Sequence, residues 1–220
     1  KAEKMKVGTC LNPLHTALAV YGCLLGYTSI AAEMGDADLK ALVEHIAAES
    51  LPVVEDPGIL SPRAFIDEVL HERFPNPAIP DTPQRIAADT SQKLPVRYGG
   101  TLRRYARQSE QALAGLEFAP LVFAGWCRYL LGVDDRGNAM PVSPDPMLPQ
   151  LQAHLKGIEV GRPDSLAGQL RPILSNAALF GVDLYAAGLG ERTEEMFRDM
   201  LAGPGAVRAT LHRNCACKQP

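Results

Sequence analysis

Lys6, Asn12 and His15 have the types and the spacing to act together on one oxygen atom of a ligand. Asn12 and His15 stand three residues apart, and positions three apart lie on the same face of a helix. An amide and an imidazole could therefore converge on a substrate oxygen while a lysine exchanges a proton with it. The structural alternative is that Asn12 only caps a helix, His15 is an ordinary hydrogen-bonded histidine and Lys6 is solvated.

Arg85 and Lys93 form a second candidate group in the segment RIAADTSQK. On one continuous helix, two cations eight residues apart face roughly the same way and could hold an anionic or polyhydroxylated ligand. Arginine offers a planar fork for a carboxylate, whereas lysine offers a compact charge with a tunable pKa. The structural alternative is surface salt bridging, with Arg85 and Asp89 as an i, i+4 pair.

The elements that must position these residues are predicted to be helices. Asn12 followed by Pro13 is typical of a helix start, and so is Ser61 followed by Pro62. Apolar residues then recur at helical spacing, and no alternating β-branched run of strand length occurs. The sequence therefore predicts an all-α chain forming a single domain. Further helices are expected at 36–51, 82–93, 101–115, 118–132, 163–179 and 192–202, with a loop at 134–149.

Composition excludes several classes of protein. The 220 residues carry 22 Lys and Arg against 25 Asp and Glu, so a nucleic-acid partner is not expected. Five cysteines, an odd number, favour a reducing compartment, and we expect a cytoplasmic protein. Residues 13–32 carry no formal charge, which raises the possibility of a membrane span, but His15, Thr16 and the Gly and Pro breaks favour a buried helix.

Other motifs have weaker functional interpretations. Cys215 and Cys217 have the wrong spacing for a common zinc site and lie in a polar tail that we expect to be frayed. The run from Gly188 to Thr193 lacks the third glycine of a dinucleotide fingerprint and is predicted to be a turn. The basic side formed by residues 103–107 is typical of a solvated helix face. No metal-binding pattern is present, so no metal site is expected.

Two blocks of the sequence resemble the C-terminal domain of the mannitol dehydrogenase family. Residues 6–15, KVGTCLNPLH, lead into a helix that ends in Leu-Gly-Tyr at 25–27. The later motifs are PNP at 75–77, DTPQRI at 81–86 and DTSQKLP at 89–95. The family commonly has four residues between its lysine and asparagine, whereas this chain has five, and a bulge before Pro13 could absorb the additional residue.

The resemblance implies roles for these residues. Lys6 would be the catalytic acid/base, Asn12 would polarise the substrate oxygen, and His15 would position it. Arg85 and Lys93 would bind the rest of a sugar chain. The fold implied is a multi-helix domain like the C-terminal domain of 6-phosphogluconate dehydrogenase-like oxidoreductases. NAD or NADP would be bound mainly by an N-terminal Rossmann domain, which these 220 residues do not contain.

The substrate and the proton-transferring residue keep alternatives. Arg85, Lys93 and Arg97 could neutralise a carboxylate, which favours a hexuronate such as fructuronate, as in a fructuronate reductase. A neutral pair such as fructose and mannitol is the alternative substrate, and Lys4 is the alternative catalytic lysine. A helical interaction domain without catalysis is the alternative function, with the apolar helix at 13–32 docking on a partner.

Overall fold

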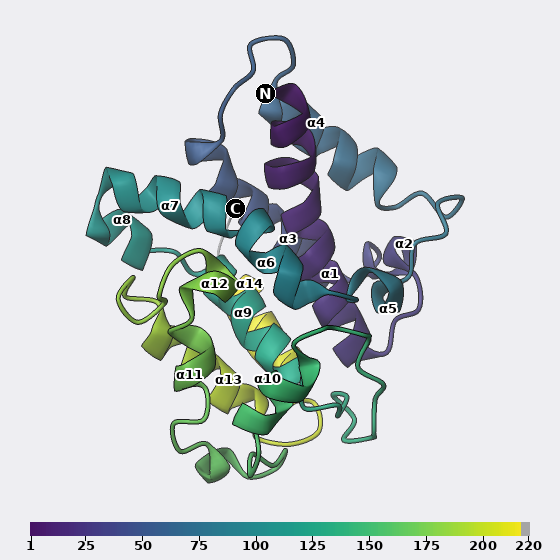
Figure 1. Ribbon diagram of the computed structural model, residues 1–220. Helices are drawn as coiled ribbons and strands as arrows, with labels where there is room; N and C mark the ends of the chain where they lie inside the picture. Colours follow the sequence, from purple (N-terminus) through teal and green to yellow (C-terminus); the bar gives the residue numbers. More distant parts are fainter. Residues whose placement is uncertain (217–220) are drawn as a thin grey trace.

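The computed structural model describes residues 1–216, and this part of the chain is built from helices joined by turns (Figure 1). Two isolated β-bridges occur in it, Val133 with Ala139 and Glu159 with Arg162, and no sheet. The predicted all-α class is therefore confirmed. The helices are η1 (Lys4–Leu11), α1 (Asn12–Leu25), α2 (Ile30–Glu33), α3 (Ala37–Ser50), η2 (Leu51–Val53), α4 (Pro62–Glu68), η3 (Val69–Arg73), α5 (Pro83–Ile86), α6 (Thr90–Arg97), α7 (Gly99–Gln108), α8 (Glu110–Ala114), α9 (Phe118–Tyr129), α10 (Leu148–His154), η4 (Pro163–Ser165), α11 (Arg171–Leu174), α12 (Ala177–Phe180), α13 (Gly190–Met200) and α14 (Ala206–Cys215).

Helix α1 begins at Asn12, as predicted, but Asn12 does not cap it, so the predicted capping role is wrong. The π-helix η1 runs directly into α1, and Asn12 has helical angles of φ −68° and ψ −35° without capping. The cause lies at Pro13, which has no N–H to donate to the carbonyl four residues earlier. The N–H of Asn12 instead donates to Val7 O, five residues back, and this wider register accommodates the proline ring.

Helix α1 is held at the centre of the molecule by a close crossing with α9. A methyl group on Gly125 of α9 would collide with the ring of Tyr21, so glycine lets the two helices approach. The buried Tyr21 hydroxyl donates a hydrogen bond to Leu121 O at 2.6 Å. Around this crossing the core is continuous, and Phe123 and Trp126 of α9 are fully buried in it. The crossing therefore fixes the helix that carries Asn12 and His15.

The expectation of a frayed C-terminal tail is wrong for the part that the structure describes. Cys215 ends α14 and is buried, and its carbonyl lies 3.0 Å from His45 Nε2 of α3. Arg208 of α14 forms an ion pair with Asp36, the residue that caps α3. Tertiary packing therefore holds a helix that the polar sequence did not predict. Cys217 lies outside the described residues.

Two of the later predicted helices are confirmed closely, as α9 and α13. The predicted helix at 101–115 is divided at Ser109, which has extended angles and caps α8. The predicted helix at 163–179 is wrong. Gly168, at φ 96°, and the cap Asn176 divide that segment into η4, α11 and α12. The loop at 134–149 is confirmed up to the start of α10.

The turn predicted from Gly188 to Thr193 is confirmed only at its start, because residues from Gly190 onward are helical. Gly188 has a φ of 76°, and α13 begins two residues later.

None of the helices in the described range is long and apolar enough to cross a membrane. Within the same range, no three His, Cys, Asp or Glu side chains are grouped to hold a metal ion.

Glu33, at the end of α2, is a buried carboxyl group packed against α1. It is fully buried, and neither of its carboxyl oxygens has a hydrogen-bond partner within the described residues. A side chain on Gly22 would collide with this carboxyl, so the glycine makes room for it. Burial, together with the nearby Asp36 carboxylate, raises the pKa of Glu33 to about 9. Glu33 is therefore protonated in the folded protein at neutral pH.

Replacing this carboxyl group should change how stability depends on pH. The folded protein retains a proton that the unfolded chain releases above the ordinary carboxyl pKa, so the free energy of unfolding falls as pH rises from about 4.5 towards 9. Glu33→Gln should reduce the loss between pH 5 and 8 by roughly 4 kcal/mol, measured by urea denaturation. The exposed Glu68→Gln variant is the control. An unchanged pH dependence in Glu33→Gln would contradict the buried, protonated carboxyl.

Candidate functional site

His15 lies near the start of α1 in a largely buried, uncharged state. Its side chain is 15% exposed and stacks on Phe74, with ring centroids 5.2 Å apart. Its Nε2 lies 3.4 Å from Asp81 Oδ2 without the geometry of a hydrogen bond, and no other partner among the described residues satisfies it. The interpretation of His15 as an ordinary hydrogen-bonded histidine is therefore wrong for Nε2, which has no hydrogen bond within the described residues.

The electrostatic surroundings of His15 favour its neutral form. Burial lowers the pKa of His15 to about 4, and the Asp81 carboxylate only partly opposes this effect. Arg97, Arg73 and Arg85 lower the pKa further, because each cation repels a charged imidazolium. At neutral pH the site therefore offers a neutral imidazole to a ligand, among several fixed positive charges.

Lys6 lies in η1, which runs directly into α1, the helix that carries His15. Its Nζ lies 5.5 Å from the ring centroid of Phe65 in α4. Phe74, which stacks on His15, directly follows η3, the helix that continues from α4. Asn12 lies between Lys6 and His15 in the sequence, is half-buried, and its amide makes no hydrogen bond within the described part of the chain. One helix therefore presents an amine, a free amide and a neutral imidazole.

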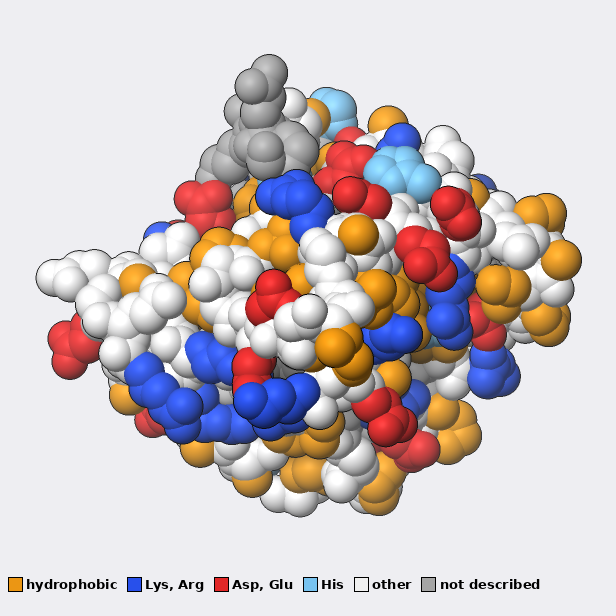
Figure 2. All heavy atoms as spheres, turned by 90° about the horizontal axis from the view of Figure 1, so that it is seen from above, with side chains coloured by type: hydrophobic (Ala, Val, Ile, Leu, Met, Phe, Trp, Pro, Cys, Tyr) orange, Lys and Arg blue, Asp and Glu red, His pale blue; other side chains and the backbone are white. Residues whose placement is uncertain are grey.

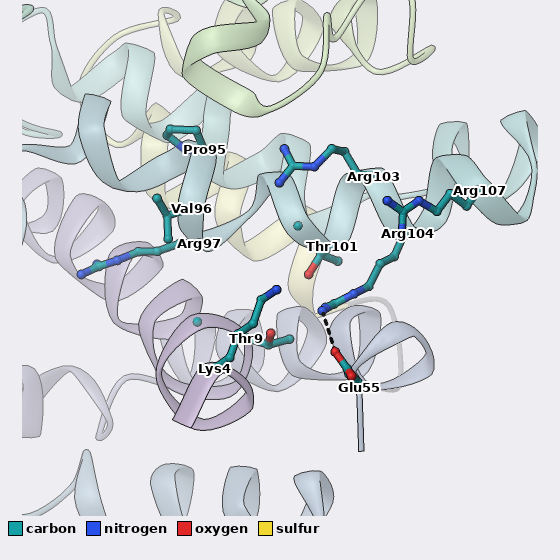
Figure 3. A pocket seen from close by; sticks show the side chains of 12 residues that line it. Lys4, Thr9, Glu55, Pro95, Val96, Arg97, Thr101, Arg103, Arg104 and Arg107 are labelled. Carbon is teal, nitrogen blue, oxygen red and sulfur yellow. Dashed lines mark ion pairs between the residues drawn. The ribbon is translucent and has the colours of Figure 1, made fainter. Parts of the chain in front are cut away.

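The π-helical turn of η1 supplies the bulge expected before Pro13. A π turn closes its hydrogen bond over five residues rather than four, so it accommodates one residue more than an α turn. The assignment of Lys6 rather than Lys4 as the catalytic lysine stays a prediction. Lys4 occupies a different place, since it lines a groove with Gly8 and Thr9 (Figure 3).

Arg85 and Lys93 do not lie on one helix, so that prediction is wrong. Helix α5 ends at Ile86, and α6 begins only after Asp89, which has a left-handed φ of 57°. Asp145, which is distant in sequence, stabilises the first turn of α6. Its carboxylate accepts hydrogen bonds from the backbone N–H and the hydroxyl of Ser91. A proline inside α6 was also not expected, yet Pro95 lies there and the helix continues to Arg97.

Arg85 of α5 and Arg97 of α6 nevertheless act electrostatically on both His15 and Lys93. Lys93 Nζ donates to Ile86 O at 2.9 Å, which ties α6 back to the end of α5. Burial lowers the pKa of Lys93, and Arg97 and Arg85 lower it further. Arg97 donates from Nη1 to Thr16 Oγ1 of α1 at 2.6 Å. Arg97 therefore joins α6, the helix that carries Lys93, to α1, the helix that carries His15.

Asp81 and Thr16 belong to this site, and the sequence analysis did not single them out. Arg85 pairs with Asp81, four residues before it, rather than with Asp89 as the alternative assumed. The i, i−4 spacing was a usable signal for that pair. Nothing local marks Thr16 as the partner of Arg97, because the two residues are 81 positions apart.

Comparisons with known proteins agree with this architecture. Residues 2–195 match the family model described as the mannitol dehydrogenase C-terminal domain. A D-mannonate oxidoreductase of Thermotoga maritima is 56% identical over 211 residues, which are 96% of this chain and 39% of that protein. A mannitol 2-dehydrogenase of Emericella nidulans is 36% identical over 191 residues, covering 83% of this chain and 34% of that protein.

A solved structure has the same helical arrangement. Pseudomonas fluorescens mannitol 2-dehydrogenase, in a ternary complex with NAD and D-mannitol, superposes with a TM-score of 0.80 at 27% identity. The match covers 100% of this chain and 41% of that protein. The chain thus spans about two fifths of the length of the proteins it resembles.

The neutral state of His15 can be tested directly. In a pH titration followed by the ¹⁵N chemical shifts of its ring, His15 should protonate near pH 4. Arg97→Gln should raise this pKa, because it removes a cation that repels the imidazolium. Arg198→Gln, an exposed change of the same charge on α13, should leave the value unchanged. Protonation near the ordinary pKa of about 6.5 would contradict the buried site.

Proposed function

Because the chain belongs to the mannitol dehydrogenase C-terminal domain family, we propose that it is the substrate-binding and catalytic domain of a NAD(P)-dependent oxidoreductase acting on a hexuronate. The reaction interconverts a ketone and a secondary alcohol. The observation that carries the choice of an acid is the surplus of cations around His15, formed by Arg97, Arg73 and Arg85, with Lys93 near Arg97 and Arg85.

The relatives support a sugar-acid substrate. The Thermotoga maritima relative is a D-mannonate oxidoreductase. D-mannonate and D-fructuronate are the alcohol and ketone forms of one six-carbon acid, so a fructuronate reductase activity corresponds to that name. A carboxylate at one end of the substrate would form ion pairs with the cations near His15.

Lys6, Asn12 and His15 would carry the chemistry at the reacting carbon. In reduction, Lys6 gives its proton to the carbonyl oxygen, and in oxidation it accepts the proton of the hydroxyl group. Asn12 donates a hydrogen bond that stabilises negative charge developing on this oxygen, and the neutral His15 orients it. Arg85 and Lys93 bind the hydroxyl groups and the acid end of the chain.

The cofactor would be held mainly by residues outside this chain. A bound nicotinamide supplies or accepts the hydride. The described residues form no parallel-strand unit of the kind that binds dinucleotides, so we expect an N-terminal Rossmann domain as the partner. The four cysteines of the described range are free thiols, which supports the expected cytoplasmic location.

Two other functions have specific support. The solved mannitol 2-dehydrogenase neighbour favours a neutral substrate pair of fructose and mannitol, because the same cations can donate hydrogen bonds to hydroxyl groups. A non-catalytic interaction domain would use the apolar first helix for docking. The burial of most of α1 in the core of this chain weighs against that use.

Substrate preference should follow the charge of the ligand. The full-length protein, assayed by NADH and NADPH oxidation, should prefer D-fructuronate or D-tagaturonate to D-fructose. Arg97→Gln should lower kcat/KM for the acid by roughly 100-fold, since hydrogen bonds to charged groups contribute about 1.5–3 kcal/mol. Activity on fructose should change far less, and Arg198→Gln should have no effect on either. A preference for fructose would assign the protein to the mannitol dehydrogenases instead.

Substitution of the polar pair on α1 separates catalysis from a structural role. Asn12→Ala and His15→Gln should each lower kcat by roughly 100-fold while leaving the helical signal and the melting temperature nearly unchanged, because both side chains act on the substrate oxygen. Asn138→Ala, in an exposed turn, is the matched control. Full turnover by both variants would support the interaction domain.

A further inference from the structure

A groove of about 610 Å³ lies between η1, α6 and α7, beside the group around His15, with which it shares only Arg97. Five cations line it, Lys4, Arg97, Arg103, Arg104 and Arg107, against one carboxylate, Glu55. Figure 3 shows these side chains around the opening, and Figure 2 shows a band of Lys and Arg on the side where α7 lies. The groove therefore carries a strong surplus of positive charge in a chain whose net charge is −3.

The internal contacts of these cations do not neutralise the groove. Glu55 is shared, at 4.0 Å from Arg104 Nη2 and 3.5 Å from Lys1 Nζ. Arg103 donates only a long hydrogen bond, 3.5 Å, to Gly181 O. Lys4 and Arg107 form no ion pair with any described residue. Cations held this close repel one another, and an anion would relieve the repulsion.

The walls of the groove are polar and leave room for a ligand. Thr9 and Thr101 are buried threonines among the lining residues. A Cβ atom built on Gly8 or Gly100 would meet no atom within 4 Å, so both backbones open onto free space. The volume is within the range of about 300–1,000 Å³ typical of small-molecule sites, well beyond a single phosphate or carboxylate.

We propose that this groove binds an anion that carries a diphosphate group. Arg97 is held by Thr16, but Arg103, Arg104 and Arg107 are three further arginines in the lining, and the planar forks of arginine bind pairs of phosphate oxygens. The consecutive Arg103 and Arg104 and the next-turn Arg107 present these forks along α7, which matches two linked phosphoryl groups better than one. A nucleoside diphosphate and the diphosphate of a dinucleotide share this chemistry. For a dinucleotide the proposal rests on the proposed function and deepens it, whereas for a nucleoside diphosphate it is independent of that function.

Calorimetric titration of the 220-residue chain tests the groove without any turnover, and the chain is suited to this because its helices share one core. Pyrophosphate should bind at least tenfold more tightly than inorganic phosphate or citrate. The double variant Arg103→Gln/Arg107→Gln should weaken pyrophosphate binding by at least tenfold. The control Arg136→Gln/Arg198→Gln makes the same change of net charge at exposed sites elsewhere and should stay within twofold.

The remaining results separate the sources of the diphosphate and protect the test from misfolding. Tighter binding of NADH than of ADP would identify a dinucleotide as the ligand, and equal binding would identify the diphosphate as the whole recognition element. Arg107→Gln alone, at an exposed residue without an ion pair, should weaken binding with an unchanged melting temperature. The proposal is overturned if pyrophosphate binds no more tightly than phosphate, or if the groove and control variants weaken binding equally.

Discussion

The crossing of α1 with α9 is the contact on which the rest of the structure depends. Tyr21 fits against Gly125 and donates to Leu121 O, so two buried helices lie closer than larger residues would allow. Close packing of this kind resists displacement, because neighbouring side chains fill the space on every side. The first helix therefore has one position, and the polar residues near its start have one direction of approach to a ligand.

The candidate site combines an uncharged histidine with several cations. Burial keeps His15 neutral. Arg97 and Arg85 lower its pKa further, because their positive charges would repel a protonated imidazole. Arg97 donates a hydrogen bond to Thr16, so the contact between α1 and α6 keeps this positive charge close to His15. An anionic substrate would be attracted to such a site, while the imidazole stays able to form a neutral hydrogen bond with the reacting oxygen.

Arg97 connects two parts of the molecule with related chemistry. It contributes to the electrostatic group around His15 and also lines the groove along α7. Both places carry more positive than negative charge, although acidic residues outnumber basic ones in the whole chain. Their adjacency would suit the proposed sugar-acid substrate and the proposed diphosphate ligand bound side by side.

The sequence by itself determined the helical class and the polar residues of the first helix, because apolar spacing and short motifs are local properties. It did not determine the π turn of η1, the break between α5 and α6, or the helix ending in Cys215. The π turn accompanies Pro13, which has no N–H to donate, so its cause is local. The break before α6 and the helix ending in Cys215 depend instead on contacts between distant residues, such as Asp145 with Ser91 and His45 with the Cys215 carbonyl. Tertiary structure alone decided these two, since the free energy of such a contact comes from partners that no local pattern specifies.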